Sequence, residues 1–344
     1  MRGQSFAALL LGLSTSVFAE LPLIDALVAS GASKFATFIQ SDPDVFALYE
    51  SGRIQTVFAP SDLVSPPVNL ARRAPSPADV AKAEIQGSED LADLKTASGS
   101  EPGSVIPTGT DSPGLGGQPQ VVTSDTRPAN VTNPTRRWAS STNLTGPSLL
   151  RISSGLGNIA NIIHADVPFE GGIIHITDNY FTLPQSISST AQALGQTTFS
   201  SLISGSNLTK SLESTQFATL FLPSNAAFAA ANVGPSVSSS TASLISNHIV
   251  GGFAGYLPVL KDGTALTTQK GETLVIRIRN GIYYVNGAKI TQANIITENG
   301  VVHIIDQVLS PSSPPPLSSG GMLSKTASFM CVIGAVAGAV MAQL

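Results

Sequence analysis

The four histidines have the widest chemical range of any side chains in this chain, because imidazole can ligate a metal, carry a proton or hydrogen-bond the backbone. They are His164, His175, His248 and His303. A zinc site would need several such ligands at close spacing, but the sequence contains no H-x-x-x-H or H-E-x-x-H motif. We therefore predict no metal and no cofactor, and we expect His175, His248 and His303 to hydrogen-bond backbone groups. Because imidazole titrates near pH ~6.5, a pH-sensing role is the alternative.

Two carboxylates stand three residues after two of these histidines, Asp178 after His175 and Asp306 after His303. They could accept a hydrogen bond from a partner, but we favour a structural role in which they bond amides just before a last strand. The chain has no G-x-S-x-G elbow, and it has no phosphate-binding loop or dinucleotide fingerprint. The sequence therefore predicts no catalytic site and no enzyme.

Basic side chains suggest two other kinds of site. Arg277 and Arg279 share one face of a predicted strand and could bind an acidic glycan, although an ordinary solvated sheet face is the simpler interpretation. The pairs Arg72-Arg73 and Arg136-Arg137 could be cut by a dibasic-specific protease, or could be ordinary solvated pairs, which we favour. Only 12% of the residues are charged and the formal net charge is -4. Without a basic stripe or patch, this composition argues against nucleic-acid binding.

Hydrophobic spacing shows which elements must position these side chains. Apolar residues recur at helical spacing over residues 23–39 and again over 187–203. After the apolar run 218–222, Ser224 or Asn225 is placed to cap a helix that runs through Phe228. Two Asn-Gly turns within residues 272–290 predict a hairpin meander, and residues 301–308 read as a final buried strand. Helices followed by an antiparallel meander predict an α+β fold.

Internal repeats divide the chain into two copies of one unit. Residues 56–62 resemble 219–225, and residues 171–184 resemble 299–311, in the same order. We predict domains at 20–184 and 186–311. The first carries an insert at about 63–135, rich in Pro, Gly, Ser and Thr, which we interpret as mostly a disordered loop. Within it, residues 77–95 could form a helix and 120–123 a strand, and deletion of 74–126 is expected to leave secretion intact.

Both ends of the chain read as targeting signals. Residues 1–19 have a basic start, a short apolar run and small residues before a cleavage expected after Ala19, which is typical of a secretory signal; a buried helix is the alternative. At the other end, a stalk at 312–318 precedes small residues, a short spacer and an apolar tail, the pattern of glycosylphosphatidylinositol attachment. We place the anchor at Ser318, with Ser319 and Gly320 as alternatives and 319–344 removed; a retained tail anchor is the other interpretation.

Asparagine-linked sugars are expected on a secreted chain. Asn130, Asn143 and Asn207 each begin an N-x-T sequon, which is the acceptor motif for this modification. Two of them flank the end of the predicted insert, in keeping with an exposed loop. The single cysteine, Cys331, lies in the expected discarded tail, so no disulfide is predicted.

The repeated motifs resemble those of the fasciclin-like domain family. The second copy matches both family motifs and the central L-x-x-H-[IV] segment. The first copy matches the first motif through Asp62 and keeps the second motif. The residues concerned are Thr219, Phe221, Pro223, Asn225, His248, His303 and Asp306, with His175 and Asp178 in the first copy. The first copy shows no counterpart of the His248 segment. The resemblance implies two tandem domains, each a β-wedge or sandwich with a cluster of helices, and it implies adhesion without enzyme chemistry.

These features together predict a secreted, glycosylated, lipid-anchored protein on the outer face of the plasma membrane and in the cell wall. Its expected role is adhesion, through contacts with other surface proteins, with a second copy of itself or with wall glycans. Linking two domains and clustering them in a membrane would make weak contacts multivalent. Two alternatives stay open at this point, a cell-wall polysaccharide-binding organiser and a factor in vacuolar or endomembrane fusion.

Overall fold

Six short helices pack against the sheets, and four of them lie where the apolar spacing predicted helices, over residues 23–39 and 187–203. The structure, a computed structural model, describes residues 20–52, 54–64, 84–85, 103–128, 148–238 and 240–309. The predicted apolar positions are buried, among them Leu27 and Ile39 in the first set of helices and Phe199 and Ile203 in the second. The helices are α1 (Leu23–Ala29), α2 (Ser33–Ser41), α3 (Pro43–Glu50), α6 (Ile187–Ala193), α7 (Thr197–Gly205) and α8 (Thr209–Ser214).

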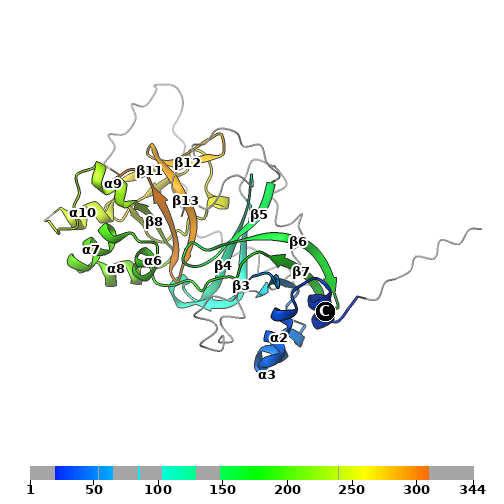
Figure 1. The fold of residues 1–344 in the computed structure, drawn as a ribbon. Helices are drawn as coiled ribbons and strands as arrows, with labels where there is room; N and C mark the ends of the chain where they lie inside the picture. Colours follow the sequence, from blue (N-terminus) through cyan, green and yellow to red (C-terminus); the bar gives the residue numbers. More distant parts are fainter. Residues whose placement is uncertain are drawn as a thin grey trace, which may run out of the picture. The chain divides into compact units, whose positions relative to one another are not determined.

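The first sheet has seven strands in the order β2-β1-β7-β6-β5-β4-β3 (Figure 1). Strands β1 and β7 are parallel neighbours, and the rest of the sheet is antiparallel. Residues of α1–α3 pack with β1 and β7 in one apolar core. The strands are β1 (Thr56–Pro60), β2 (Glu84–Ile85), β3 (Val105–Ser112), β4 (Gln118–Pro128), β5 (Ser148–Ser153), β6 (Ile159–Phe169) and β7 (Gly172–Thr177).

The second sheet repeats this topology, in the order β10-β11-β12-β13-β14-β8-β9. Its parallel pair is β8 with β14, and in both sheets this pair sets a phenylalanine beside a histidine: Phe58 with His175 and Phe221 with His303. The sequence repeat is therefore a repeat of the fold, and the α+β prediction is confirmed. The strands are β8 (Ala218–Pro223), β9 (Ile249–Val250), β10 (Ala265–Thr267), β11 (Thr273–Arg279), β12 (Ile282–Val285), β13 (Ala288–Thr297) and β14 (Gly300–Ile305).

The predicted hairpin meander is formed by β11, β12 and β13. Both residues of each Asn-Gly pair, Asn280-Gly281 and Asn286-Gly287, have positive φ, as the tight turns between twisted strands require. Ser224 accepts a hydrogen bond from the amide of Ala227 and caps α9 (Asn225–Ala230), as predicted. The remaining elements of this half are α10 (Thr241–Ser246) and the short helix η3 (Leu257–Val259).

The interpretation of residues 63–135 as mostly a disordered loop is wrong for residues 103–128. This stretch forms β3, the turn η2 (Pro113–Leu115) and β4, and it buries Ile106, Leu115 and Val122. The strand expected at 120–123 is present within β4. The stretch is ordered because its apolar side chains enter two cores, one shared with β5 and β6 and one shared with the second half of the chain. The expectation that residues 74–126 add no core is therefore also wrong.

The helix considered for residues 77–95 does not form at residues 84–85, which are the strand β2; the rest of that segment lies outside the described residues. Strand β2 pairs with β1 in the register in which β9 pairs with β8, Thr56 opposite Ile85 and Thr219 opposite Val250. The first copy thus has a counterpart of the strand that follows His248, which the sequence comparison missed. Two strand residues without the preceding histidine gave too little pattern to detect.

Backbone pairing joins the two halves of the described chain. Gly155 bridges to Ile296 and Gln185 to Thr297. The amide of Ile296 donates to the Ser154 carbonyl at 3.4 Å, and the amide of Glu298 donates to the Gln185 carbonyl at 3.0 Å. In addition, the Gln120 Nε2 atom donates to the Thr297 carbonyl at 3.1 Å. Apolar side chains close the contact: Val105 and Val121 of the first half pack with Tyr256, Ile296 and Val301 of the second.

In the first half, the edge of β6 that corresponds to this edge of β13 has other hydrogen-bond partners. The register places Pro168 opposite Ile173, as it places Ile296 opposite Val301. Pro168 has no amide hydrogen to donate. The next outward amide, that of Glu170, donates to the Leu21 carbonyl at 2.8 Å. The Leu21 carbonyl thus accepts the amide that follows β6, as the Gln185 carbonyl accepts the amide that follows β13.

Several predicted features lie outside the described residues. They are Ala19 and the signal segment, the sequons at Asn130 and Asn143, the pairs Arg72-Arg73 and Arg136-Arg137, and the anchor region with Ser318, Ser319 and Gly320. Over the described ranges, we find no helix with the length and apolar character needed to cross a membrane.

Candidate functional site

Two polar side chains of the second-copy motifs, Thr219 and His303, meet at one loop, residues 253–257. The Thr219 hydroxyl donates to the Phe253 carbonyl at 2.5 Å and accepts from the Gly255 amide at 2.7 Å. The His303 Nε2 atom lies 2.9 Å from the Gly255 carbonyl. Thr219 and His303 are both fully buried. The motif therefore satisfies backbone groups that would otherwise be buried without a partner, which stabilises the loop.

Asn294 joins Thr219 and His303 in holding this loop, an arrangement that we call the clamp, and no motif in the sequence indicated it. The backbone amide of Asn294 donates to His303 Nδ1 at 3.4 Å, and the side-chain Oδ1 atom accepts from the backbone amide of Leu257 at 2.8 Å. Because Nδ1 of His303 accepts a hydrogen bond, the ring proton is on Nε2, where it donates to Gly255. Asn294 adopts a positive φ of 55°, a conformation that asparagine tolerates better than most residues. A bulge in β13 at this point turns the side chain into the loop.

The first copy repeats the arrangement around His175. The amide of Asp166, which also has a positive φ, donates to His175 Nδ1 at 3.3 Å. The ring of Phe58 stacks on His175 at 5.3 Å between centroids, as Phe221 stacks on His303 at 5.6 Å. His164, the fourth histidine, is exposed on β6 and belongs to neither cluster. Both motif histidines are thus parts of the interior.

His248 connects α10 to the end of the described chain. Its Nδ1 atom lies 2.8 Å from the Leu244 carbonyl, and its Nε2 atom accepts a hydrogen bond from the Leu309 amide at 2.9 Å. This pair of contacts requires the neutral ring, with its proton on Nδ1. Burial lowers the pKa of His248 to about 4, against a smaller opposing effect of the Leu244 carbonyl.

We predict that His248 makes the protein less stable in acid. The folded pKa of about 4 lies below the ordinary value of 6.5, so the contribution is complete above pH 6.5 and is lost as pH falls toward 4. The free energy of unfolding should fall by on the order of 3 kcal/mol over this range, since one pKa unit corresponds to about 1.4 kcal/mol. Urea denaturation at several pH values measures it. His248→Gln should remove this part of the pH dependence, whereas His164→Gln, at the exposed histidine, should retain it; an unchanged slope in His248→Gln would contradict the assignment.

The motif carboxylates and amides also bond the backbone. Asp306 Oδ1 accepts from the Lys289 amide and Asp178 Oδ1 from the Asn161 amide, at 2.8 and 2.7 Å. The amides belong to the strand before the last one, close to the role that we expected. Asn225 Oδ1 accepts from the amide of Thr198 at the start of α7 at 3.1 Å.

Asp62 is the first-copy counterpart of Asn225. Its carboxylate accepts from the amides of Ser33 and Lys34 at the start of α2, at 3.0 and 2.8 Å. The hydrogen bond from the Lys34 amide is the main reason that the pKa of Asp62 is lowered. The Asn or Asp position of the motif is thus the cap that ties a strand to the second helix of its unit.

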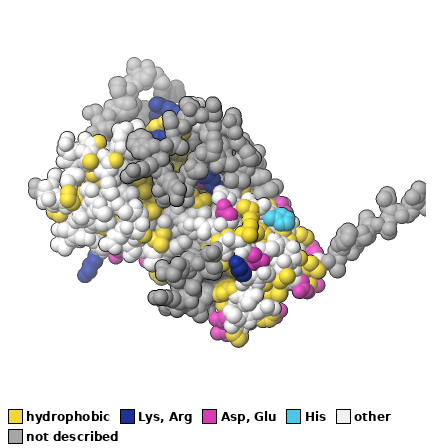
Figure 2. Space-filling view, viewed as in Figure 1, with side chains coloured by type: hydrophobic (Ala, Val, Ile, Leu, Met, Phe, Trp, Pro, Cys, Tyr) yellow, Lys and Arg dark blue, Asp and Glu magenta, His cyan; other side chains and the backbone are white. Residues whose placement is uncertain are grey.

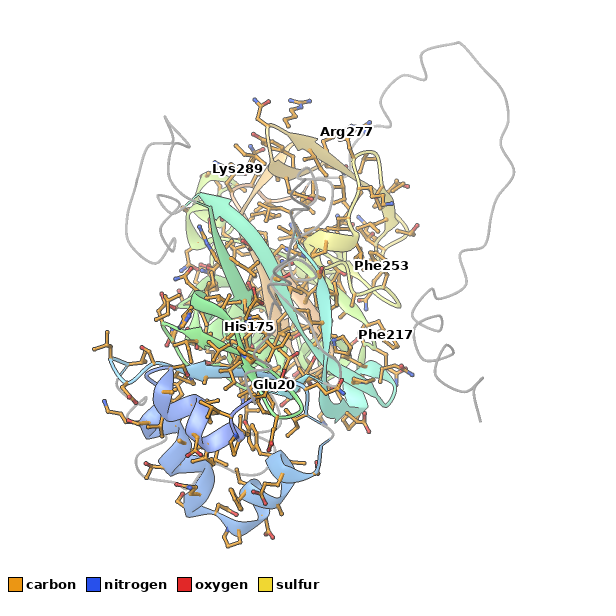
Figure 3. The ribbon with its side chains drawn as sticks, turned by 90° about the vertical axis from the view of Figure 1, so that its right-hand side faces the viewer. Glu20, His175, Phe217, Phe253, Arg277 and Lys289 are labelled. Atoms are coloured by element: carbon orange, nitrogen blue, oxygen red, sulfur yellow. The ribbon has the colours of Figure 1, made fainter. Side chains whose placement is uncertain are left out.

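The outward face of β11–β13 is different in character. Cross-strand register sets Arg277 opposite Tyr284, and Tyr284 opposite Lys289. Arg279 lies over the Tyr284 ring, 5.9 Å from its centroid. Figure 3 shows Arg277 and Lys289 on this hairpin, at a distance from the buried His175. We call Arg277, Arg279, Tyr284 and Lys289 the basic face. The sequence predicted the two arginines; Tyr284 and Lys289 join them only through strand pairing.

Other sites are less developed. Across the described ranges, no group of three or more His, Cys, Asp or Glu side chains could hold a metal ion. Asn207, the described sequon asparagine, is exposed between α7 and α8, and its glycosylation stays a prediction.

Figure 2 shows a viewed face on which most side chains are uncharged and the acidic ones gather toward the part that carries α2 and α3.

The structure therefore defines an α+β protein with two copies of one unit, in which motif side chains hydrogen-bond the backbone of their own copy. The fasciclin domain model matches residues 195–311, and Protein sll1483 of Synechocystis is 31% identical over 129 residues, covering 35% of this chain and 71% of that protein. The chain belongs to the fasciclin domain family.

Fungal relatives are also similar. The fasciclin-like arabinogalactan protein CTB11 of Cercospora beticola is 32% identical over 178 residues, covering 51% of this chain and 48% of its own length. A fasciclin-like arabinogalactan protein of Arthroderma benhamiae is 35% identical over 162 residues, covering 46% of this chain and 38% of its own. The chain thus spans about half or less of these two relatives. Among solved structures, a FAS1 domain pair from the insect cell adhesion molecule Fasciclin I aligns with a TM-score of 0.38 and 16% identity, covering 82% of this chain and 98% of that one.

Proposed function

We propose that this protein is a cell-surface adhesion glycoprotein that meets its partners through the outward faces of its fasciclin domains and catalyses no reaction. One observation carries the proposal: the polar motif side chains that could do chemistry are turned inward and bonded to the chain's own backbone. Thr219, His248 and His303 each hold a buried main-chain group. What distinguishes one member from another must then lie on the surface.

The expected location supports this role. The signal segment and the anchor pattern would place the domains outside the cell on a lipid, with Ser318 as the attachment site. Anchored copies that diffuse in a membrane would meet partners many at a time, and linked weak contacts can raise avidity by ~100-fold or more. Organisation of cell-wall polysaccharide is a second candidate function, and the basic face is the observation that favours it.

The adhesion proposal is tested with the soluble ectodomain, residues 20–317, coupled to beads. Clumping of the beads, or their capture by intact cells of the source organism, is the expected result. Beads that carry an unrelated glycoprotein at the same density serve as the control. If the ectodomain beads neither clump nor bind cells in buffers from low to physiological salt, the adhesion proposal is wrong. Release of the full chain from intact cells by a phosphatidylinositol-specific phospholipase would test the anchor separately.

A further inference from the structure

We propose that the basic face binds a linear, polyanionic polysaccharide. This inference rests on the proposed function, because it assumes that the face is exposed to extracellular glycans. It names the ligand class and the residues that would hold it: Arg277, Arg279 and Lys289, arranged around Tyr284.

Strand geometry places the three cations on one surface. Arg277, Tyr284 and Lys289 form a row across three neighbouring strands, so Arg277 and Lys289 are about 10 Å apart at the backbone, two strand spacings. Arg279 stands two residues along β11 from Arg277, hence on the same side and about 7 Å away. Both arginines are exposed, and Tyr284 and Lys289 are half-buried. A ligand that touches all of them must be extended along the sheet.

None of the three cations forms an ion pair with any residue of the described chain. The neighbouring acids are Asp262 and Asp306. Each accepts a hydrogen bond from a backbone amide: Asp262 Oδ1 from the amide of Ile278 and Asp306 Oδ1 from the amide of Lys289, each at 2.8 Å. Glu272 lies one residue before β11. A hydrogen bond from an amide leaves a carboxylate its charge, so these acids lie near the cations without forming ion pairs with them in the described residues.

Tyr284 holds one of these cations in position. The Arg279 guanidinium lies over the ring, and such stacking is attractive while it leaves the N–H donors at the edge of the guanidinium available. Those donors match a carboxylate or sulfate in a two-point fork, which a lysine cannot provide. Arg279 thus needs less ordering on binding than a freely rotating side chain.

The first copy provides an internal comparison, because the same row exists there with other residues. Asp178 bonds the Asn161 amide as Asp306 bonds the Lys289 amide, so Asn161 corresponds to Lys289. From Asn161 the register leads to Arg151 and then to Asp125. Arg151 and Asp125 have opposite charges, lie directly opposite each other and are buried. In the first copy this row holds a buried cation opposite a buried anion. In the second copy it holds two cations, Arg277, which is exposed, and Lys289, which is half-buried.

These charges favour a polymer over a small anion. A single contact between exposed charges contributes little, typically ~0–1 kcal/mol, and both arginines of the face are exposed. Three cations spaced along a sheet can instead hold successive charges of one chain, and the contacts then act together. An acidic surface of a second copy is the competing occupant, because the acidic side chains gather elsewhere on the molecule (Figure 2).

The test uses the soluble ectodomain, residues 20–317, with alginate as the polyanion and dextran as the neutral polymer. Arg277→Gln/Lys289→Gln should weaken alginate binding about tenfold, the effect of losing two exposed charge contacts. The matched control, Lys210→Gln/Lys270→Gln, removes the same charge from exposed lysines on α8 and before β11, and should bind as the wild type does. Binding should weaken as salt rises, because exposed charges are screened, and all variants should melt at the same temperature.

Three results would overturn the proposal. These are no alginate binding by the wild type, equal binding to dextran, or an equal loss in both double variants. Bead clumping, scored in the same buffers, separates this proposal from adhesion. Clumping without alginate binding overturns the ligand class and leaves adhesion standing, whereas alginate binding without clumping or cell capture supports the ligand class and counts against adhesion. If Arg277→Gln/Lys289→Gln abolishes clumping and the wild type ignores alginate, the face meets a second copy and the polysaccharide proposal is wrong.

Discussion

Deleting residues 105–126 and closing the gap with a short Gly-Ser linker is expected to abolish folding of the ectodomain. The deletion removes Ile106, Leu115 and Val122, each at most 3% exposed. Losing one large buried aliphatic side chain typically costs about 2–5 kcal/mol, and a domain has only about 5–15 kcal/mol of stability. The deletion also uncovers Ile296 and Val301 of the second half, which Val105 and Val121 pack against. We expect retention in the endoplasmic reticulum instead of secretion.

Single substitutions give the graded form of this experiment. Ile106→Ala removes a side chain that is 2% exposed and should cost about 2–5 kcal/mol in chemical denaturation. Ile163→Ala makes the same change on β6 at a residue that is 53% exposed, and should stay within about 0.5 kcal/mol of the wild type. A deletion variant that is secreted at the normal level and resists protease like the wild type would show that β3 and β4 are dispensable.

Gly300→Ala is a point substitution that we expect to be strongly destabilising. Gly300 begins β14 at φ +152°, and a Cβ atom there would lie 1.9 Å from the Ala218 carbonyl oxygen of the neighbouring parallel strand. Backbone cannot yield without breaking the β8–β14 pair, so we expect a loss of at least about 3 kcal/mol, the range of strained backbone and overpacked core sites. Chemical denaturation of the purified ectodomain measures the loss.

Gly234→Ala is the control for this substitution, because a Cβ atom at Gly234 has no neighbour within 4 Å and its φ is ordinary. It should be neutral or slightly stabilising. The first copy offers a parallel experiment at Gly172, where a Cβ atom would lie 2.0 Å from the Gln55 carbonyl oxygen. A Gly300→Ala protein as stable as Gly234→Ala would show that the strand pair can separate to admit a methyl group.

The repeat and the turns made most of the fold predictable. Two motifs that recur in the same order, at 56–62 and 219–225 and at 171–184 and 299–311, identified two copies of one unit, and the Asn-Gly pairs at 280 and 286 located the meander. Capping by Ser224 followed from a side chain that bonds a nearby amide. These features are local, or they are marked twice in the sequence, so periodicity and turn chemistry were sufficient.

What the sequence did not reveal depends on contacts between distant residues. Val105 and Val121 look like isolated apolar residues in a polar insert, and they become core only because Ile296 and Val301 lie against them. Asn294 carries no motif, and it enters the clamp because a bulge in β13 turns it inward. Tyr284 and Lys289 join the basic face through strand register, which composition and spacing along the chain do not specify.

Pro168 has a consequence for assembly. In the second half, the outward edge of β13 is completed by backbone from the first half, so one unit is added to another by strand pairing. A third unit, or a second molecule, would have to add at the equivalent edge of β6. There, position 168 offers no donor, and the amide of Glu170 already bonds Leu21. Growth by strand addition through this edge therefore terminates at the pair, as natural sheets with a proline at an exposed edge resist edge-to-edge aggregation. Under the proposed adhesion function, contacts between copies at this edge would then have to be made by side chains, which separate and re-form more easily than a continuous sheet.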